Sequence, residues 1–233
     1  MSNGYKLLNW QNDGEPALNA ENLNALTDCV ATAFIEKTAT SEQIKNAIQA
    51  VHNAGGGSVV FPAGTWELDS TINLDNIQNV VIKGQGKYVT FIDGTLSLDE
   101  NCTKVEIKGV TFEGSYGIDN DGKDITIENC ILSGVGYESS GINNKGNNVS
   151  IENCICEGDS DSGIFNSGEN MKIINNTCSG YIYGIWDSSD PVDENRNYYS
   201  GNEITGDINV TNVKWGDNFH REGTGSPNHY WEE

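Results

Sequence analysis

Basic residues are scarce in this chain of 233 residues. Lys and Arg number 13 against 34 Asp and Glu, which gives a formal net charge of -21. Because nucleic-acid binding requires clusters of Lys and Arg, we expect no nucleic acid as a partner. Proline is also rare, with 4 residues, and the charged fraction of 20% is ordinary. This composition excludes a disordered or collagen-like chain and favours a packed core.

Long apolar runs are missing as well. No stretch approaches the roughly 18 apolar residues of a membrane helix, and the opening MSNGYKLLNWQNDGEPA has no apolar signal region. We therefore expect no membrane span and synthesis in the cytoplasm. The length suits one domain with a small attached segment.

A ten-residue phrase recurs along the chain. ITIENCILSG, at 125–134, returns as VSIENCICEG and more loosely as MKIINNTCSG. Gly and Asn alone occupy one column of this alignment, and both tolerate the left-handed backbone region, so the column predicts one bend per repeat. Apolar residues lie two positions before the bend and again three positions after it. The bend column is Gly84, Gly109, Asn129, Asn153, Asn175 and Gly201.

A second motif follows each bend and supplies a third short strand. It reads Gly117–Ile118, Gly141–Ile142, Gly163–Ile164 and Gly184–Ile185. Three short strands in every 20 to 26 residues indicate an all-β fold, a single-stranded parallel β-helix in which each strand pairs with its counterpart one coil away. A leucine-rich repeat would need an LxxLxL frame, and a β-sandwich would not keep columns in register.

An amphipathic helix is predicted before the first coil. Thr40 and Gln43 form a capping-box pattern, and the apolar residues from Ile44 to Val51 follow a helical period over 41–54. This α-helical cap, the following GGGSVVFPAGTWEL and the repeats together resemble the pectate-lyase-like β-helix superfamily over about residues 41–206. The resemblance implies a right-handed coil. The superfamily contains polysaccharide lyases, glycosidases, epimerases and phage tailspikes, so it does not fix the function.

A second resemblance lies upstream. NWQNDGEPALNAENLNAL, residues 9–26, resembles the N-terminal segment of tail, baseplate and fibre proteins of phages that infect Gram-positive bacteria. It implies an attachment and oligomerisation segment at 1–40, partners in the tail or baseplate through residues 9–38, and location in the virion tail. Leu23, Leu26, Val30 and Ala33 have the spacing of a helical seam, and phage spikes of this fold are similar in being trimers. We expect a homotrimer, with a C-terminal cap or tail at 207–233.

Four cysteines, Cys130, Cys154, Cys156 and Cys178, fall at apolar positions of the repeat. We expect them to be buried, reduced thiols. No Cys-x-x-Cys pair or nearby His supports a metal site, and the acidic turn DNDGKD at 119–124 has Cys130 where a calcium-binding EF-hand needs Glu. No metal or cofactor is predicted.

Catalytic motifs of the superfamily are not found. The polygalacturonase set of Asn-Thr-Asp, Asp-Asp, Gly-His-Gly and Arg-Ile-Lys is missing, and no Arg-x-x-Arg pattern of the lyases occurs. Arginine is limited to Arg196 and Arg221, and the three histidines lie outside the coils. The catalytic residues stay unassigned, and a lyase or glycoside hydrolase remains an alternative function.

One coil carries an insertion. WDSSDPVDENR, residues 186–196, places eleven residues where earlier coils have six, and insertions on repeat scaffolds form loops, often on the binding face. We predict a sugar site there, with Trp186 as the stacking platform, or else a solvated loop. Nine of the 20 aromatic residues lie in the last 53 positions. The polar members of the predicted site are Asp187, Asp190, Asp193, Glu194 and Arg196.

Together these patterns favour a phage tail-associated receptor-binding protein that recognises a bacterial surface polysaccharide. Two alternatives stay open. One is a small polysaccharide-degrading enzyme of the same fold, and the other is a structural tail or baseplate component without a ligand.

Overall fold

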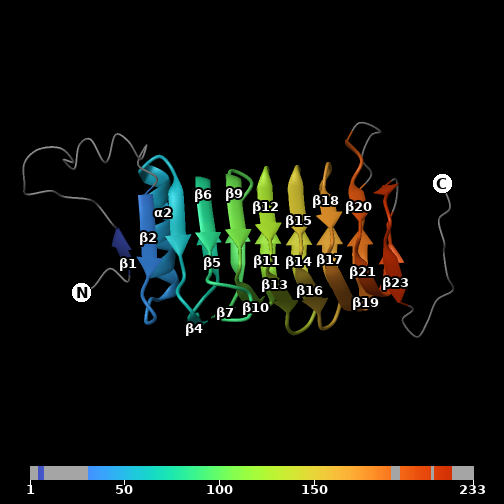
Figure 1. Cartoon of the computed structure of the whole chain (residues 1–233), viewed down its shortest axis with the longest axis horizontal. Helices are drawn as coiled ribbons and strands as arrows, with labels where there is room; N and C mark the ends of the chain where they lie inside the picture. Colours follow the sequence, from blue (N-terminus) through green and yellow to red (C-terminus); the bar gives the residue numbers. More distant parts are fainter. Residues whose placement is uncertain (1–4, 8–30, 190–194, 211–212, 222–233) are drawn as a thin grey trace, which may run out of the picture.

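The chain folds as an all-β, right-handed parallel β-helix with one short helix at its N-terminal end (Figure 1). The computed structural model describes residues 5–7, 31–189, 195–210 and 213–221. Its coils lie side by side along the long axis of the molecule, and the two described ends lie at opposite ends of the stack. The fold class predicted from the repeats is confirmed.

One sheet, here the ten-strand sheet, runs the length of the stack. All neighbours pair in parallel except β1, which is antiparallel to β2. Its strands are β1 (Tyr5–Leu7), β2 (Ala31–Ile35), β3 (Gly57–Val60), β6 (Gln78–Lys83), β9 (Thr103–Lys108), β12 (Ile125–Glu128), β15 (Val149–Glu152), β18 (Lys172–Ile174), β20 (Tyr198–Ser200) and β22 (Lys214–Trp215).

The second sheet, here the thirteen-strand sheet, has two arms that meet in the long strand β19 (Thr177–Asp187). The first arm contains β4 (Gly64–Glu67), β7 (Thr90–Asp93), β10 (Thr111–Gly114), β13 (Ile131–Gly134), β16 (Ile155–Gly158), β21 (Glu203–Asn209) and β23 (Phe219–Arg221). The second arm contains β5 (Ile72–Leu74), β8 (Leu96–Leu98), β11 (Tyr116–Asn120), β14 (Ser140–Asn144) and β17 (Ser162–Asn166). A full coil therefore has three strands, as the sequence predicts.

The core consists of stacked columns of inward side chains. In the ten-strand sheet, each residue two positions before the bend pairs with its counterpart on the next coil, and every member is 1% exposed or less. Burial of such side chains contributes about 1.5 to 3 kcal/mol each. The column is Ile82, Ile107, Ile127, Ile151, Ile173 and Tyr199.

The predicted bend is confirmed at five of its six positions. Gly109, Asn129, Asn153, Asn175 and Gly201 have φ between 53° and 68°. Gly84 does not have a positive φ, so there the prediction is wrong. Glycine is needed at that position for another reason, because a Cβ would strike the carbonyl oxygen of Gly109 and the side chain of Thr90.

A second column of left-handed residues lies near the start of the strands of the ten-strand sheet. Lys104, Asp124, Asn148 and Asn170 have φ of 55° to 58°. The last three form an exposed ladder in which Asn148 Nδ2 donates to Asp124 Oδ1 at 3.0 Å and Asn170 Nδ2 donates to Asn148 Oδ1 at 2.6 Å. This second bend was not predicted, because Lys104 and Asp124 stand where the first bend column has only Gly or Asn.

Helix α2 (Ser41–Asn53) covers the N-terminal end of the stack. Both hydrogen bonds of the Thr40–Gln43 capping box are present, and the buried face contains Ile44, Ala47, Ile48 and Val51. The apolar face packs against β2, β3, β5 and β6, so the exposed end of the core is closed as expected.

The stack extends beyond its predicted bounds at both ends. β2 lies within the segment assigned to attachment, yet it pairs in parallel with β3, and Ala33 is fully buried in it. Ala33 therefore does not belong to a helical seam, and Leu23, Leu26 and Val30 lie outside the described residues. After residue 206, β22 and β23 add a further coil to the stack.

The repeat cysteines point into the core. Cys130, Cys154, Cys156 and Cys178 are buried and free, as is Cys102, and Cys156 pairs in register with Cys178. Burial raises the pKa of Cys102 to about 11 and that of Cys156 well above its usual range. A thiol with a raised pKa is a poor nucleophile, so Cys102 and Cys156 act as small apolar side chains.

Candidate functional site

Three aromatic side chains gather on the outer surface of the second arm. Phe165 and Trp186 are partners in register on β17 and β19, and their rings meet edge to face with centroids 5.1 Å apart. Tyr183, also on β19, lies 5.3 Å from the Trp186 ring. All three are partly exposed. We name Phe165, Tyr183 and Trp186 the aromatic cluster.

The repeat itself explains why this cluster faces outward. Strands β11, β14 and β17 contain Gly-Ile-x-Asn, and β19 contains Gly-Ile-x-Asp. The Ile is buried in every coil, so the following residue alternates to the outside of the strand. That outward position is Asp119 in β11 and Asn143 in β14, and it becomes Phe165 and then Trp186 toward the C-terminal end.

Two tyrosines project beside the cluster, at the corner where the two arms meet. Tyr137 lies in the turn between β13 and β14 and is 89% exposed, and Tyr181 lies where β19 changes arms and is 81% exposed. The turn at 159–161 lies between them: Ser160 Oγ donates to the Gly136 carbonyl at 2.7 Å, and the Ile182 amide donates to the Asp161 carbonyl at 3.0 Å. We name this corner and the aromatic cluster the aromatic surface.

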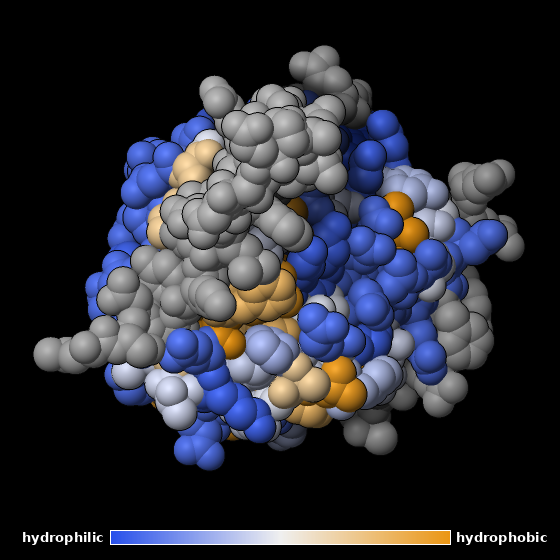
Figure 2. All heavy atoms as spheres, turned by 60° about the vertical axis from the view of Figure 1, so that its left-hand side comes forward, coloured by the Kyte–Doolittle hydropathy of each residue, from blue (hydrophilic) through white to orange (hydrophobic). Residues whose placement is uncertain are grey.

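Exposed large hydrophobic residues also lie elsewhere on the described surface, at Phe34, Tyr88, Val89, Phe91 and Tyr198. On the side shown in Figure 2, hydrophilic residues cover most of the described surface and hydrophobic residues gather in small areas. Isolated apolar residues on a surface are normal, but contiguous patches mark binding sites. Val135 and Ile182, which are 47% and 44% exposed, extend the patch around Tyr137 and Tyr181.

Carboxylates surround the tyrosines of this corner. Glu138 and Asp159 are exposed and Asp161 is partly buried. Partial burial raises the pKa of the Asp161 carboxyl above its ordinary value, and the negative charge of Glu138 adds to the effect. Within the described residues none of these three carboxylates forms an ion pair.

The structure describes three of the six site residues predicted from sequence, and two of these, Trp186 and Asp187, lie outside an exposed loop. Trp186 lies on strand β19 and not in the inserted loop. Asp190, Asp193 and Glu194 lie outside the described residues, and Arg196 is half-buried after that gap. Within the described part of the chain, the structure brings Trp186 together with Phe165 and Tyr183, and not with the predicted polar set.

Asp187 is an interior residue, so its predicted place in an exposed loop is wrong. It is 1% exposed and accepts hydrogen bonds from Asn166 Nδ2 at 3.0 Å, Asn197 Nδ2 at 2.8 Å, the Ser189 amide at 3.0 Å and the Tyr199 hydroxyl. Four donors satisfy the carboxylate, which explains why a buried charge is tolerated without a cation.

This carboxylate ends a ladder of buried amides. Asn120 Nδ2 donates to Asn144 Oδ1 at 2.7 Å, and Asn144 Nδ2 donates to Asn166 Oδ1 at 2.7 Å. Asn166 then donates to Asp187, which has no donor of its own to continue the series. The Gly-Ile-x-Asn motif already contained this signal, because Asp187 occupies the Asn position of the last repeat.

Sequence reasoning also missed Phe165, Tyr137, Glu138 and Asp161. Phe165 was recoverable, since it aligns with Trp186 in the motif. Tyr137 and Glu138 lie in a turn that is longer than the turn between β10 and β11, so no column marks them.

Neither a metal site nor a membrane span is found in the part of the chain that the structure describes. The described residues bring no three His, Cys, Asp or Glu side chains into a metal-binding group. None of the described helices has the length and hydropathy that a membrane span requires.

Comparison with known proteins identifies the fold and not a family. No family model matches the chain, and no curated protein matches its sequence. The pectin methylesterase PemA from Erwinia chrysanthemi is similar in structure, with a TM-score of 0.51 and 12% identity over 70% of this chain, which spans 61% of that protein. A pectin methylesterase from Aspergillus niger has a TM-score of 0.51 and 12% identity, covering 77% of this chain and 82% of its own.

A third similar structure is a pectin methylesterase variant solved with a hexasaccharide. It has a TM-score of 0.52 and 9% identity, and the match covers 74% of this chain and 82% of that one. At such low identity these likenesses establish a shared architecture only. This chain thus shares the right-handed parallel β-helix fold of these solved structures.

Proposed function

We propose that this chain is a phage tail protein whose β-helix binds a bacterial surface glycan through the aromatic surface. The observation that carries the proposal is the exposure of Tyr137 and Tyr181 beside the cluster of Phe165, Tyr183 and Trp186. Aromatic rings present an apolar face that suits the apolar face of a sugar ring, and their rotational freedom is small. The solved neighbours, pectin methylesterases by name, support a polysaccharide ligand by analogy.

The tail role rests on a separate resemblance. Residues 9–26 resemble attachment segments of phage tail proteins, so the chain would join the virion tail through residues 9–38 and assemble as a homotrimer after synthesis in the host cytoplasm. The aromatic surface lies on coils distant from β1 along the axis of the stack (Figure 1). A trimer would present three such surfaces, and the resulting avidity would exceed the affinity of one site.

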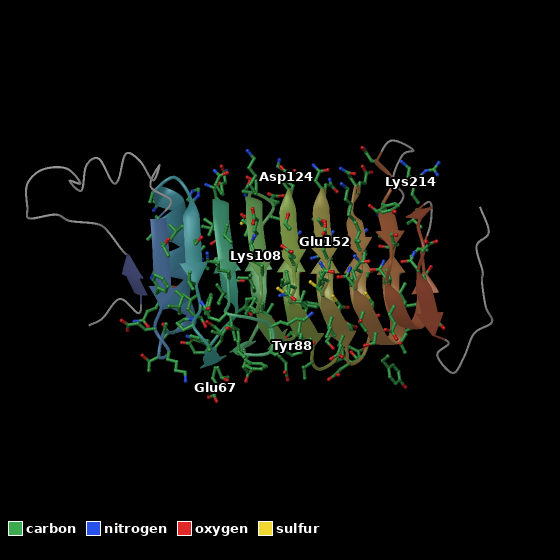
Figure 3. All side chains as sticks on the ribbon, viewed as in Figure 1. Glu67, Tyr88, Lys108, Asp124, Glu152 and Lys214 are labelled. Carbon is green, nitrogen blue, oxygen red and sulfur yellow. The ribbon has the colours of Figure 1, made fainter. Side chains whose placement is uncertain are left out.

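The binding test compares exposed tyrosines inside and outside the surface. We expect the Tyr137→Ala, Tyr181→Ala double variant to weaken binding of labelled protein to Gram-positive cell-wall polysaccharide about five- to tenfold, on the scale of two lost ring contacts. Tyr88→Ala is the matched control, because Tyr88 is 67% exposed and lies in the turn between β6 and β7 (Figure 3). Equal binding by all three proteins would contradict the proposal.

The attachment test is independent of the glycan. Deleting residues 9–26 should prevent incorporation into particles and leave glycan binding unchanged. If the deleted protein still enters particles, the tail attachment must lie elsewhere. Sedimentation equilibrium of the full chain decides between a trimer and other oligomers.

An enzymatic function has one observation in its favour. Glycosidases use carboxyl pairs of which one has a raised pKa, and Asp161 beside Glu138 has that property. New reducing ends after incubation with wall polysaccharide, lost in Asp161→Asn, would establish the enzyme. Binding without cleavage would establish the receptor-binding protein.

A further inference from the structure

The charge around the aromatic surface is negative and unneutralised. Glu138, Asp159 and Asp161 line its corner, and Asp207 pairs in register with Tyr183 on the next coil. On the described strands of the thirteen-strand sheet, Arg221 of β23 is the sole Lys or Arg. The lysine nearest in the repeat, Lys145, already lies 3.3 Å from Asp121 and 3.7 Å from Asp119.

The position of Asp161 makes this negative charge costly without a ligand. Its carboxyl is partly desolvated, and Glu138 repels its charged form, so ionisation is disfavoured in the free protein. The attraction of a neighbouring cation would offset both penalties. The adjacent tyrosine rings fit the same ligand, because aromatic faces attract ammonium groups.

Three ligand classes can be separated by charge. A polyuronate would bring carboxylates against Glu138, Asp159 and Asp161, and like charges at a shared site destabilise a complex. A neutral glycan would donate hydroxyl hydrogen bonds to these carboxylates but would bring no positive charge to offset theirs. A glycan with ammonium groups would pair with them and stack on Tyr137 or Tyr181.

We infer that the aromatic surface recognises a glycan that carries protonated amino groups. This inference rests on the proposed function and names the chemical class of its ligand. The sugar rings contact the tyrosines, and the amino groups of the sugar donate hydrogen bonds to the carboxylates of Glu138 and Asp161. Recognition then depends on ion pairs as well as on ring contacts, and it weakens as the salt concentration rises.

The test uses three hexasaccharides that differ in charge: glucosamine hexamer at a pH at which its amines are protonated, its fully N-acetylated form, and hexagalacturonate. Calorimetry measures each dissociation constant for the full chain. We expect the glucosamine hexamer to bind at least about tenfold more tightly than the N-acetylated hexamer, on the scale of a few partly exposed ion pairs, and hexagalacturonate not to bind.

A pair of double variants locates the effect. Glu138→Gln with Asp161→Asn removes two carboxylates from the surface, whereas Glu128→Gln with Glu152→Gln removes two from the ten-strand sheet, so both change the net charge equally. The first double variant should weaken glucosamine hexamer binding about five- to tenfold and reduce its salt dependence, and the second should change binding less than about twofold. Thermal melting confirms that both fold.

Three results would overturn the inference. One is equal binding of charged and N-acetylated hexamers, a second is equal loss in both double variants, and a third is no binding of the glucosamine hexamer. The first leaves the proposed function intact, because the tyrosine variants still decide glycan binding. Loss of wall binding in Tyr88→Ala to the same degree as in the Tyr137, Tyr181 variant would instead remove the proposed function itself.

Discussion

The two sheets build one core but present different exteriors. On the ten-strand sheet, Lys108 pairs in register with Glu128, and Lys108 Nζ lies 2.6 Å from Glu106 Oε2. On the first arm of the thirteen-strand sheet, Glu67, Asp93 and Glu113 follow one another in register with no lysine in the column. Figure 3 shows Lys108 and Glu152 at mid-height of the stack and Glu67 at its lower margin.

The difference teaches where the chain is free to vary. Inward columns of both sheets must stack in register, so isoleucine recurs in each of them. Outward columns face solvent, and there opposite charges compensate each other on one sheet and acidic and aromatic residues accumulate on the other. When two exteriors share one scaffold, the one whose charges are not balanced is the better candidate for a ligand-binding site.

The largest expected effect is on stability, in a comparison of a buried and an exposed aspartate of the thirteen-strand sheet. Asp187→Ala should lower the free energy of unfolding by about 3 kcal/mol, because it removes a buried carboxylate that accepts hydrogen bonds from Asn166, Asn197 and Tyr199. Asp93→Ala, on an exposed position of the same sheet, should change it by less than about 0.5 kcal/mol. Urea denaturation measures both, and similar losses would show that Asp187 does not end the ladder.

A second experiment tests the left-handed bend at the end of β15 in the ten-strand sheet. Asn153→Val should cost about 1 to 3 kcal/mol, because a β-branched residue is strained at the φ of 55° found there. Asn153 is exposed, so lost packing does not contribute. Glu157→Val, exposed on β16 and in an extended strand, is the control. Equal melting temperatures of the two variants would remove the left-handed bend from the explanation of the repeat.

The smallest expected effect concerns pH. The pKa of Asp161 is raised in the folded state, so the folded protein holds this proton more tightly, and stability falls as the pH rises from about 3.8 through the raised value. Asp161→Asn removes this loss of stability, because the asparagine side chain does not ionise. We expect the variant to be a few tenths of a kcal/mol more stable at neutral pH, after allowance for solvent screening, and unchanged near pH 3.

Urea denaturation at the two pH values checks this prediction. Glu152→Gln on the ten-strand sheet serves as the matched removal of one charge. A variant that is less stable than the parent at neutral pH would show that Asp161 stabilises the free protein, and its carboxyl would then not be held at a cost for a ligand.

The sequence predicts the parts of the fold that repeat. Asn129, Asn153 and Asn175 mark the bend because a left-handed φ restricts the residue type, and isoleucines mark the interior because burial does. The last coil was not predicted, because few residues of the repeat pattern recur in it. Asn218 Oδ1 accepts from Asn202 Nδ2 at 2.8 Å, as Asn202 Oδ1 does from Asn176 Nδ2 at 3.1 Å, but few apolar positions accompany it.

The site was harder to predict than the fold. Trp186 lies partly exposed on strand β19, and the insertion after it drew the prediction toward a loop. Asp187 was grouped with exposed acids although the motif places it with buried asparagines. No sequence pattern marked the carboxylates of the corner. Glu138 and Asp161 are 23 positions apart in the sequence, and only the winding of consecutive coils brings them together.

The turn between β6 and β7 has a consequence for how the stack opens. Lys87 Nζ donates to the carbonyl oxygen of Asn153 at 3.0 Å, its own carbonyl accepts from the Thr111 hydroxyl, and the Gly86 amide donates to Gly109. A coil normally touches only its neighbours, so a stack can fray one coil at a time from either end. Lys87 fastens coils that are not adjacent. Local unfolding should therefore proceed through the C-terminal coils and stop before Asn153. Amide hydrogen exchange should show this as higher protection of the backbone amides in β15 than in β18.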